Sequence, residues 1–335
     1  MERAATYRAL LADVERGAGL GGEQAWYDEL DARDDELRAA LEWFHEQGDA
    51  DSALHLATRL RLFWMERGRF DEGRAALERA VAAPGAASSE RRAAALAALG
   101  LLAFRQGDNE RARDCLNESL ALARSDGDRA VEGLALNGLS RVALRDGDYP
   151  ALRRFAEESK TIAEEGGDRK ALISPLHMLA TVAKMEGNAD EARRWYGETL
   201  ALSRELGAEA TLAGELHNLG TLEKHEGYLE RAEELFRESL ERSRAMNNGY
   251  LIPYGLLDFG NLAALQGDGT RAARLLAAAE TAVAATGAVF DPDDQPEFDR
   301  AVALAKELAG EDFSAAWAAG RALPLDDALD DALAT

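Results

Sequence analysis

Two histidines are the residues of this 335-residue sequence that most directly suggest chemistry. His177 and His217 stand forty positions apart, and imidazole is a common metal ligand. A shared ion would need both rings within bonding distance, whereas equivalent positions on packed helices lie about 8–10 Å apart. No H-E-x-x-H motif supplies further ligands beside them. The sequence therefore predicts no metal site. Its spacing also suggests no Ser-His-Asp or Cys-His arrangement and no cofactor, so we predict that the protein is not an enzyme.

Both histidines belong to a polar ladder that repeats at the same spacing. If a helix stripe through Leu96 and Leu99 is buried, steps of about 100° per residue place the ladder on the opposite helix face. Its members are Arg105, Asn137, Arg141, Arg145, His177, Thr181, Lys184, His217, Asn218, Thr221, Lys224, His225, Tyr254, Asp258 and Asn261. Arg and Lys could hold a carboxylate or phosphate, and amides and imidazoles could fix a peptide backbone or sugar hydroxyls. We predict a ligand-binding groove here; the alternative is an exposed helix face that is polar only because it meets water.

Other reactive side chains have structural explanations. Cys115 aligns at the forty-residue spacing with Phe155, Trp195 and two leucines, which predicts a core position rather than a redox role. An acidic series also repeats, made up of Glu118, Glu158, Glu198 and Glu238. These glutamates are one repeat apart, so a solvated ridge on the outer layer is favoured over acid-base catalysis. The five tryptophans are interpreted as helix-packing anchors.

The elements that position these residues are helix pairs. Glycines recur every forty residues, at Gly107, Gly147, Gly187, Gly227 and Gly267. Each glycine can end a first helix in the left-handed conformation. The next residue can cap a second helix in four of five copies, Tyr228 being the exception. Leucine-rich rows three and six residues apart form one apolar stripe in each first helix. Such pairs must stack on neighbours to bury that stripe, which predicts a solenoid.

This pattern resembles the tetratricopeptide repeat (TPR), in a variety of about forty residues rather than the usual ~34. Leu219 and Gly220 match the family's Leu-Gly pair, and the small, large, small positions of the second helix are matched by Ala232, Phe236 and Ser239. The resemblance implies an all-α, right-handed superhelical TPR solenoid. Ser140 and Ala180 replace the first-helix glycine, and Lys160 replaces a leucine, so we expect the second copy to be the least regular.

The spacing divides the chain into four parts. We predict an N-terminal helical cap at 1–33, a divergent first repeat at 34–89, five regular repeats at 90–289 and a C-terminal helical cap at 290–335. Within the first part, the glycine-rich run at 17–22 is interpreted as a hinge, because no strand precedes it and no Gly-Lys-Ser/Thr ending follows it. Residues 84–89 are expected to form a short loop. Three shorter helices are expected after Gly287.

The charge balance narrows the possible partners. Thirty-nine basic and 62 acidic residues give a net charge of −23, which argues against direct binding of nucleic acid. One cysteine cannot form an intramolecular disulfide, and a reducing compartment is the natural setting. The sequence shows neither a signal peptide nor an apolar run long enough to span a bilayer. We therefore expect a soluble, cytoplasmic protein without a membrane partner.

A second resemblance covers nearly the whole chain. It rests on the stretches 23–26, 35–43, 63–64, 72–74, 313–317 and 320–323. These look like the C-terminal sensor region of bacterial regulators of the LuxR, SARP and AfsR type, in which a DNA-binding domain and a STAND-class ATPase precede TPR-like repeats. Here the Walker A and helix-turn-helix motifs are missing, so neither activity is carried over. Such domains could lie upstream in the same chain or in a separate protein.

Both resemblances and the polar ladder lead to one functional prediction. We expect a non-enzymatic module of signal transduction or transcriptional regulation whose concave groove takes a peptide, a protein segment or a small effector. The alternative is a general assembly scaffold that binds proteins through its acidic convex face or its ends. The two differ in which surface must be mutated to lose the partner.

Overall fold

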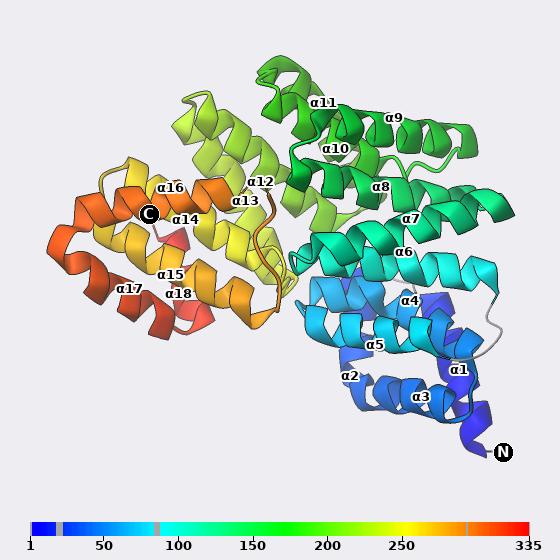
Figure 1. Ribbon diagram of the computed structural model, residues 1–335. Helices are drawn as coiled ribbons and strands as arrows, with labels where there is room; N and C mark the ends of the chain where they lie inside the picture. Colours follow the sequence, from blue (N-terminus) through cyan, green and yellow to red (C-terminus); the bar gives the residue numbers. More distant parts are fainter. Residues whose placement is uncertain (1, 18–22, 84–87, 293, 335) are drawn as a thin grey trace.

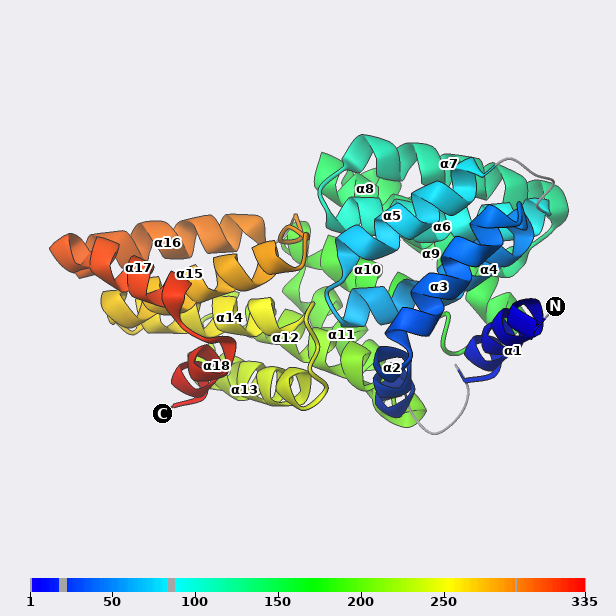
Figure 2. The same cartoon turned by 90° about the horizontal axis from the view of Figure 1, so that it is seen from below.

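The chain folds as a curved succession of helices. The computed structural model describes residues 2–17, 23–83, 88–292 and 294–334, and within these ranges helices and turns make up the chain, with no strand. The helices follow one another along a bent path that places the two chain ends at opposite ends of the molecule (Figures 1 and 2). The predicted all-α solenoid is thereby confirmed. In these ranges, no helix combines the length and apolar character that crossing a membrane requires.

Five helix pairs form the repeats, and helices flank them at both ends. The pairs are α6 (Ser89–Arg105) with α7 (Asn109–Asp126), α8 (Arg129–Asp146) with α9 (Tyr149–Gly166), α10 (Ile173–Met185) with α11 (Ala189–Leu206), α12 (Glu209–His225) with α13 (Leu229–Ala245), and α14 (Ile252–Leu265) with α15 (Gly269–Ala285). The preceding helices are α1 (Glu2–Gly17), α2 (Glu23–Ala32), α3 (Asp34–Glu46), α4 (Ala50–Glu66) and α5 (Phe70–Ala82). The following ones are α16 (Gln295–Ala309), the short 3-10 turn η1 (Gly310–Asp312), α17 (Phe313–Ala322) and α18 (Leu325–Leu333). The three shorter helices expected after Gly287 are present. Residues 18–22 and 84–87, which hold most of the predicted hinge and loop, lie outside the described residues.

The turns inside the pairs form as the sequence predicts. All five predicted glycines have φ between 71° and 88°. The caps are confirmed as well, since Asp108, Asp148, Asn188 and Asp268 each accept a hydrogen bond from a backbone amide three residues on, while Tyr228 makes no such bond. Sequence reasoning missed a second series at the ends of the second helices. It consists of Gly127, Gly167, Gly207 and Gly287, with Asn247 at φ 48° in the remaining place. Asn is among the few residues with a side chain that adopt this conformation readily.

Each pair is held together by a repeated contact between its two helices. The leucine-rich stripe is buried in every copy, except that Leu219 is only partly buried. Gly220 has the role expected of the family's glycine, because a Cβ there would lie 2.6 Å from the ring of Phe236. The Ser239 hydroxyl donates to the carbonyl of Ala213 at 2.8 Å. Equivalent bonds, 26 residues apart, join the pairs of the first two copies.

The expected irregularity of the second copy is wrong. Its helices α8 and α9 both run for 18 residues with complete caps. Ser140 fits because its hydroxyl donates to the carbonyl of Asn137 at 2.7 Å and because the residue equivalent to Phe236 is the small Ala156. The shorter first helices are α10 and α14, of 13 and 14 residues. Proline explains both, since Pro175 and Pro253 cannot donate within a helix and are tolerated only in its first turn.

The solenoid touches itself across its inner surface. The Gly249 amide, in the loop before α14, donates to the carbonyl of Glu66 at 2.9 Å. A Cβ on Gly249 would lie 2.9 Å from the carbonyl oxygen of Arg67, so the two backbones approach too closely for any side chain. In the loop before α16, the Val289 amide donates to the carbonyl of Arg105 at 2.9 Å. In Figure 1 the loops after α13 and α15 meet the ends of α4 to α6 at the centre of the molecule. The first repeat and the last copies therefore enclose the space between them.

A ladder of aromatic rings reinforces this closure. Tyr250 lies edge-on to Phe70 of the first repeat at 6.0 Å, and to Tyr254 at 5.3 Å. Tyr254 in turn meets Phe290 at 5.4 Å, and Phe290 meets Phe298 of α16 at 5.2 Å. Such ring pairs add roughly 0.5–1.5 kcal/mol each beyond the burial of their area. The first repeat, the fifth copy and the C-terminal helices are thus fixed relative to one another.

Candidate functional site

A pocket lies on the inner surface where the solenoid closes. The first helices of the repeats, α6, α8, α10, α12 and α14, supply one wall. The end of α4, the loop before α14 (Asn248, Tyr250 and Leu251) and two residues before α16, Asp291 and Asp294, supply the other. The cavity volume is about 310 Å³. That is the lower end of the range for small-molecule sites, roughly 300–1,000 Å³, and is enough for one end of a peptide or a small organic molecule.

Six members of the predicted polar ladder come together in this pocket. They are Arg105, Arg141, His177, His217, Asn218 and Tyr254. The forty-residue spacing explains the gathering, because equivalent positions on successive first helices point to the same side of a curved row. No single helix carries the site. The stacking of the five pairs therefore builds the pocket, and the closing loops complete it.

The pocket contains a buried ion pair between Arg105 and Asp291. The guanidinium of Arg105 forms an ion pair with the Asp291 carboxylate and lies 4.5 Å from the centre of the Tyr250 ring. The Tyr250 hydroxyl donates to Asp291 at 3.1 Å, and the Asp291 amide donates to the Tyr254 hydroxyl at 3.2 Å. Burial alone would lower the pKa of Arg105, but the Asp291 carboxylate outweighs it and raises the pKa. Burial raises the pKa of both tyrosines, so both keep their protons.

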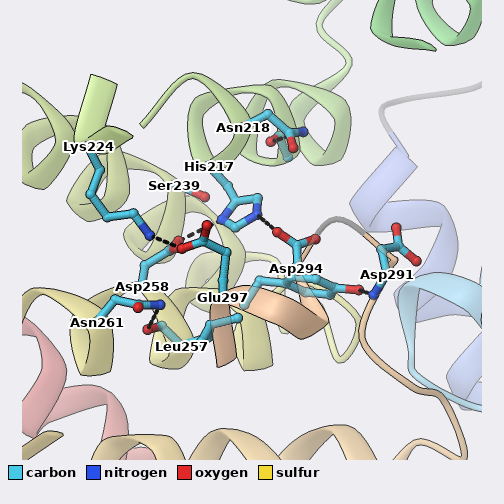
Figure 3. Close-up of polar contacts among 12 residues, drawn as sticks. His217, Asn218, Lys224, Ser239, Leu257, Asp258, Asn261, Asp291, Asp294 and Glu297 are labelled. Carbon is cyan, nitrogen blue, oxygen red and sulfur yellow. Dashed lines mark hydrogen bonds and ion pairs between the residues drawn. The ribbon is translucent and has the colours of Figure 1, made fainter. Parts of the chain in front are cut away.

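A buried histidine ties two elements at the floor of the pocket. His217 Nδ1 lies 2.7 Å from Asp258 Oδ2, and its Nε2 lies 3.4 Å from Asp294 Oδ1 (Figure 3). All three side chains are buried. Burial favours the neutral ring, yet the carboxylates of Asp258 and Asp294 outweigh it and raise the pKa of His217 to about 10. The ring is therefore an imidazolium at neutral pH, and it links α12, α14 and the loop before α16.

The pocket also carries polar groups that the protein leaves open. His177 Nδ1 lies 2.9 Å from Glu215 Oε1. The other carboxylate oxygen, Glu215 Oε2, is buried and has no hydrogen-bond partner in the part of the chain that the structure describes. Across the same described ranges, no hydrogen bond or ion pair engages the guanidinium of Arg141. Burial is the main reason that the pKa of Arg141 is lowered, and the nearby charge of Arg105 adds to the effect. An open cation and an open acceptor thus face one cavity.

The remaining ladder residues lie outside the pocket. They are Asn137, Arg145, Thr181, Lys184, Thr221, Lys224, His225, Asp258 and Asn261. Several of them are buried rather than exposed to a groove, as Thr181, Thr221 and Asp258 show with 2% exposure each. The Thr181 hydroxyl and the Asn261 amide donate to carbonyls of their own helices. Thr181, Thr221 and Asp258 therefore do not lie on an exposed helix face, as the projection had placed them.

The cause of this difference is a second buried face on the inner helices. A projection from one helix allows for a single buried stripe, whereas Asp294 and Glu297 contact the inner face of α12 and Phe290 packs against Tyr254 of α14. Glu297 of α16 shows the effect, since its carboxylate lies 2.6 Å from Lys224 Nζ and 2.5 Å from His225 Nε2. Burial would raise the pKa of Glu297, but His225 and Lys224 outweigh it and hold the pKa well below its usual range. Lys224 and His225 thus anchor α16, as Figure 3 shows for Lys224.

Sequence reasoning also missed several residues of the site. Tyr250, Asp291 and Asp294 come from loops whose position depends on closure, which the repeat spacing does not contain. A signal did exist for Glu215, because its row of equivalent positions otherwise holds Ala95, Ala135, Pro175 and Gly255. A charge among small residues was a reason to expect a special role. Cys115, by contrast, is buried with 1% exposure, as predicted.

The two histidines each face a carboxylate of their own. Glu215 accompanies His177, and Asp258 accompanies His217. Among the described residues, no three or more His, Cys, Asp or Glu side chains are placed to hold one ion. The chemistry that this site offers is recognition through charge and hydrogen bonds.

Comparison with known families defines the class of protein. Tetratricopeptide-repeat models match residues 93–126, 131–205 and 216–248. Together with the stacked helix pairs and their glycine turns, these matches identify tetratricopeptide repeats in this part of the chain. No curated protein sequence matches it.

Solved structures share the fold at low sequence identity. A Rap protein complexed with competence and sporulation factor aligns over 98% of this chain and 89% of its own, with a TM-score of 0.61 and 12% identity. A Rap conjugation gene regulator of plasmid pLS20, in complex with the Phr* peptide, covers 76% of this chain and 75% of its own at a TM-score of 0.54 and 14% identity. A STAND protein with a tetratricopeptide-repeat sensor from Pyrococcus horikoshii covers 94% of this chain and half of its own, with a TM-score of 0.55 and 14% identity. The chain thus resembles about half of that last protein.

Proposed function

We propose that this chain is a non-enzymatic binding module that takes a peptide or a peptide-like segment of a protein into the pocket at its closure. The observation that carries the proposal is the pocket itself. It is lined by packed helices, and within the described residues it presents an unpaired guanidinium, Arg141, and a carboxylate oxygen without a hydrogen-bond partner, Glu215 Oε2. Open buried polar groups are costly unless a ligand pairs with them. Arg105, His217 and Tyr254 are held in place by ion pairs and hydrogen bonds, so this part of the site is preorganised.

The similar folds support this proposal. The Rap protein that aligns over 98% of the chain was solved with competence and sporulation factor, and the pLS20 regulator was solved with the Phr* peptide. The similarity to a STAND protein with a repeat sensor supports a place in signal transduction or transcriptional regulation. In that setting the module receives the signal, and domains in the same chain or in a partner respond to it. A small organic effector is the second ligand class that a cavity of about 310 Å³ accommodates.

A pair of matched glycine substitutions tests whether the pocket is the site. Gly214 lines the pocket, and a Cβ there would lie 3.7 Å from Leu251, an ordinary contact. A Cβ on Gly197 of α11 would meet nothing within 4 Å. Gly214→Phe should therefore fill the pocket without disturbing the backbone, while Gly197→Phe adds the same ring to an exposed outer helix.

The experiment passes a pool of randomised hexapeptides over the immobilised full chain and quantifies retained peptide by mass spectrometry. We expect the wild type and Gly197→Phe to retain the same peptides, and Gly214→Phe to lose them. Retention by all three proteins alike would place binding elsewhere. Retention by none would reject peptide binding, and a thermal-shift screen of small organic molecules would follow.

The alternative scaffold role depends on the acidic outer ridge. Three of its four glutamates are paired with arginines of their own or a neighbouring helix. The pairs are Glu118 with Arg92, Glu158 with Arg124 and Glu238 with Arg242. Pairing reduces the charge that the ridge presents to a protein partner. Reversing the charges of Glu158 and Glu198 should leave peptide retention unchanged if the pocket is the site, and should abolish binding if the convex face is.

A further inference from the structure

The unsatisfied groups of the pocket indicate which chemistry the ligand must bring. The pocket holds two guanidinium groups but only one arginine-paired carboxylate. Asp291 pairs with Arg105, and among the described residues no carboxylate forms a direct ion pair with the guanidinium of Arg141. Arginine stays protonated in proteins, so this guanidinium keeps its charge beside the cavity. A carboxylate of the ligand can pair with it directly.

The other acids of the pocket do not fill this role. Glu66 accepts a hydrogen bond from the side-chain amide of Asn248. Asp294 lies against the imidazolium of His217, and Glu215 lies against His177. Each of these carboxylates also repels further negative charge. A monoanion such as a carboxylate therefore suits the site better than a dianionic phosphate, which would face the same acids with twice the charge.

A second group of the ligand is indicated by Glu215. Its side chain is 5% exposed, and its Oε2 atom has no hydrogen-bond partner within the described residues. Glu215 is close enough to Arg141 for its charge to influence the pKa of that guanidinium. A buried carboxylate oxygen without a donor is costly, and an N–H group of the ligand would satisfy it.

Part of the pocket wall is apolar. Leu62 on α4 lines it with 39% of its surface exposed, and Met65, Leu144 and Ile173 line it from α4, α8 and α10. An exposed leucine and a half-buried methionine beside charged groups favour a ligand with an apolar side chain. The ligand must therefore bring a negative charge, an N–H donor and an apolar group together into a cavity of about 310 Å³.

We propose that the pocket binds a short peptide by a carboxylate placed on Arg141, an N–H group donated to Glu215 and an apolar side chain against the wall formed by Leu62, Met65 and Leu144. This inference rests on the proposed function and specifies its ligand. The carboxylate can come from the free C-terminus of the peptide or from an Asp or Glu side chain. Both sources present the same planar anion, which a guanidinium binds through two parallel hydrogen bonds.

Three synthetic pools of randomised hexapeptides distinguish these sources. The first pool has a free C-terminus and omits Asp and Glu, the second is amidated and includes them, and the third is amidated and omits them. Retained peptide is measured for the wild type, Arg141→Gln, Arg141→Lys, Glu215→Gln and Arg154→Gln. Arg154 is the matched control, because it is exposed on α9, and within the described residues its guanidinium contacts the ring of Phe155 alone. Thermal denaturation of each variant shows that it is folded.

The wild type should retain the first pool, the second or both at least about tenfold more than the third. Arg141→Gln should lose about 10- to 100-fold of that retention, the range expected for a charge-assisted hydrogen bond. Arg141→Lys should lose less of that retention. Glu215→Gln should retain less of both pools that carry a carboxylate, and Arg154→Gln should retain as much as the wild type. Equal retention of all three pools, still lost in Gly214→Phe, would overturn the carboxylate inference while the peptide pocket stands. Retention of none would overturn both.

Discussion

The buried imidazolium of His217 makes stability depend on pH in a direction that the structure fixes. The ring lies 2.7 Å from Asp258 and 3.4 Å from Asp294, so its positive charge joins α12 to α14 and to the loop that closes the solenoid. His217→Gln removes that charge but keeps a side chain of similar reach. We expect the substitution to destabilise the fold by about 3–5 kcal/mol near neutral pH, because two buried carboxylates lose their cation.

The magnitude and the sign of this pH dependence follow from the pKa of His217. A rise from 6.5 to about 10 corresponds to roughly 5 kcal/mol of preference for the protonated ring, at about 1.4 kcal/mol per unit. Since the folded-state pKa lies above that of the unfolded chain, this stabilisation is complete below about pH 6.5. It declines as the pH rises and is lost above about pH 10. The difference in unfolding free energy between wild type and His217→Gln should therefore shrink across this window.

Urea unfolding followed by far-ultraviolet circular dichroism, at a series of pH values from about 5 to 10.5, measures that difference. Subtracting the variant from the wild type removes the titration of groups that both proteins share. His45→Gln is the control of opposite sign, because burial lowers the pKa of His45 and its substitution should matter only below about pH 6.5. If the difference in unfolding free energy between the wild type and His217→Gln did not change from pH 6 to 10, the claim that His217 is an imidazolium would be refuted.

Three further predictions test other parts of the structure. Lys224→Met should destabilise the fold by about 3 kcal/mol in urea unfolding, because it leaves the buried carboxylate of Glu297 without its lysine. The double variant Lys224→Met, Glu297→Met should recover much of that loss. Gly249→Ala should cost about 1–3 kcal/mol, since its Cβ would lie 2.9 Å from the Arg67 carbonyl oxygen; an unchanged midpoint would show that the closure is loose. Cys115 should react with a thiol reagent only after unfolding, because burial removes access to the thiol and raises its pKa, and rapid labelling of the native protein would contradict its core position.

The repeat spacing was sufficient to predict the solenoid because it records local requirements. A glycine at Gly227, a cap at Asp148 and a leucine at Leu216 each report on their own turn or helix face. Proline positions are equally local signals, because Pro175 and Pro253 shorten the first helices of their repeats. For such features, position in the sequence and position in the fold are nearly equivalent.

The site could be predicted only in part because it depends on closure. Arg105, Arg141, His177 and His217 share the inner surface through the spacing alone. Whether each of them is open or paired depends on segments that arrive from outside the repeat, such as the loop bearing Asp291. The same closure covers Lys224 and leaves Arg141 open. The forty-residue repeat spacing does not predict long-range contacts of this kind.

A crystal structure of the full chain with its most strongly retained hexapeptide tests the central claim most directly. The account predicts a peptide carboxylate on the guanidinium of Arg141, a peptide N–H directed at Glu215 and an apolar side chain against Leu62 and Met65. A peptide lying on the outer helices, or one in the pocket whose carboxylate points away from Arg141, would contradict it.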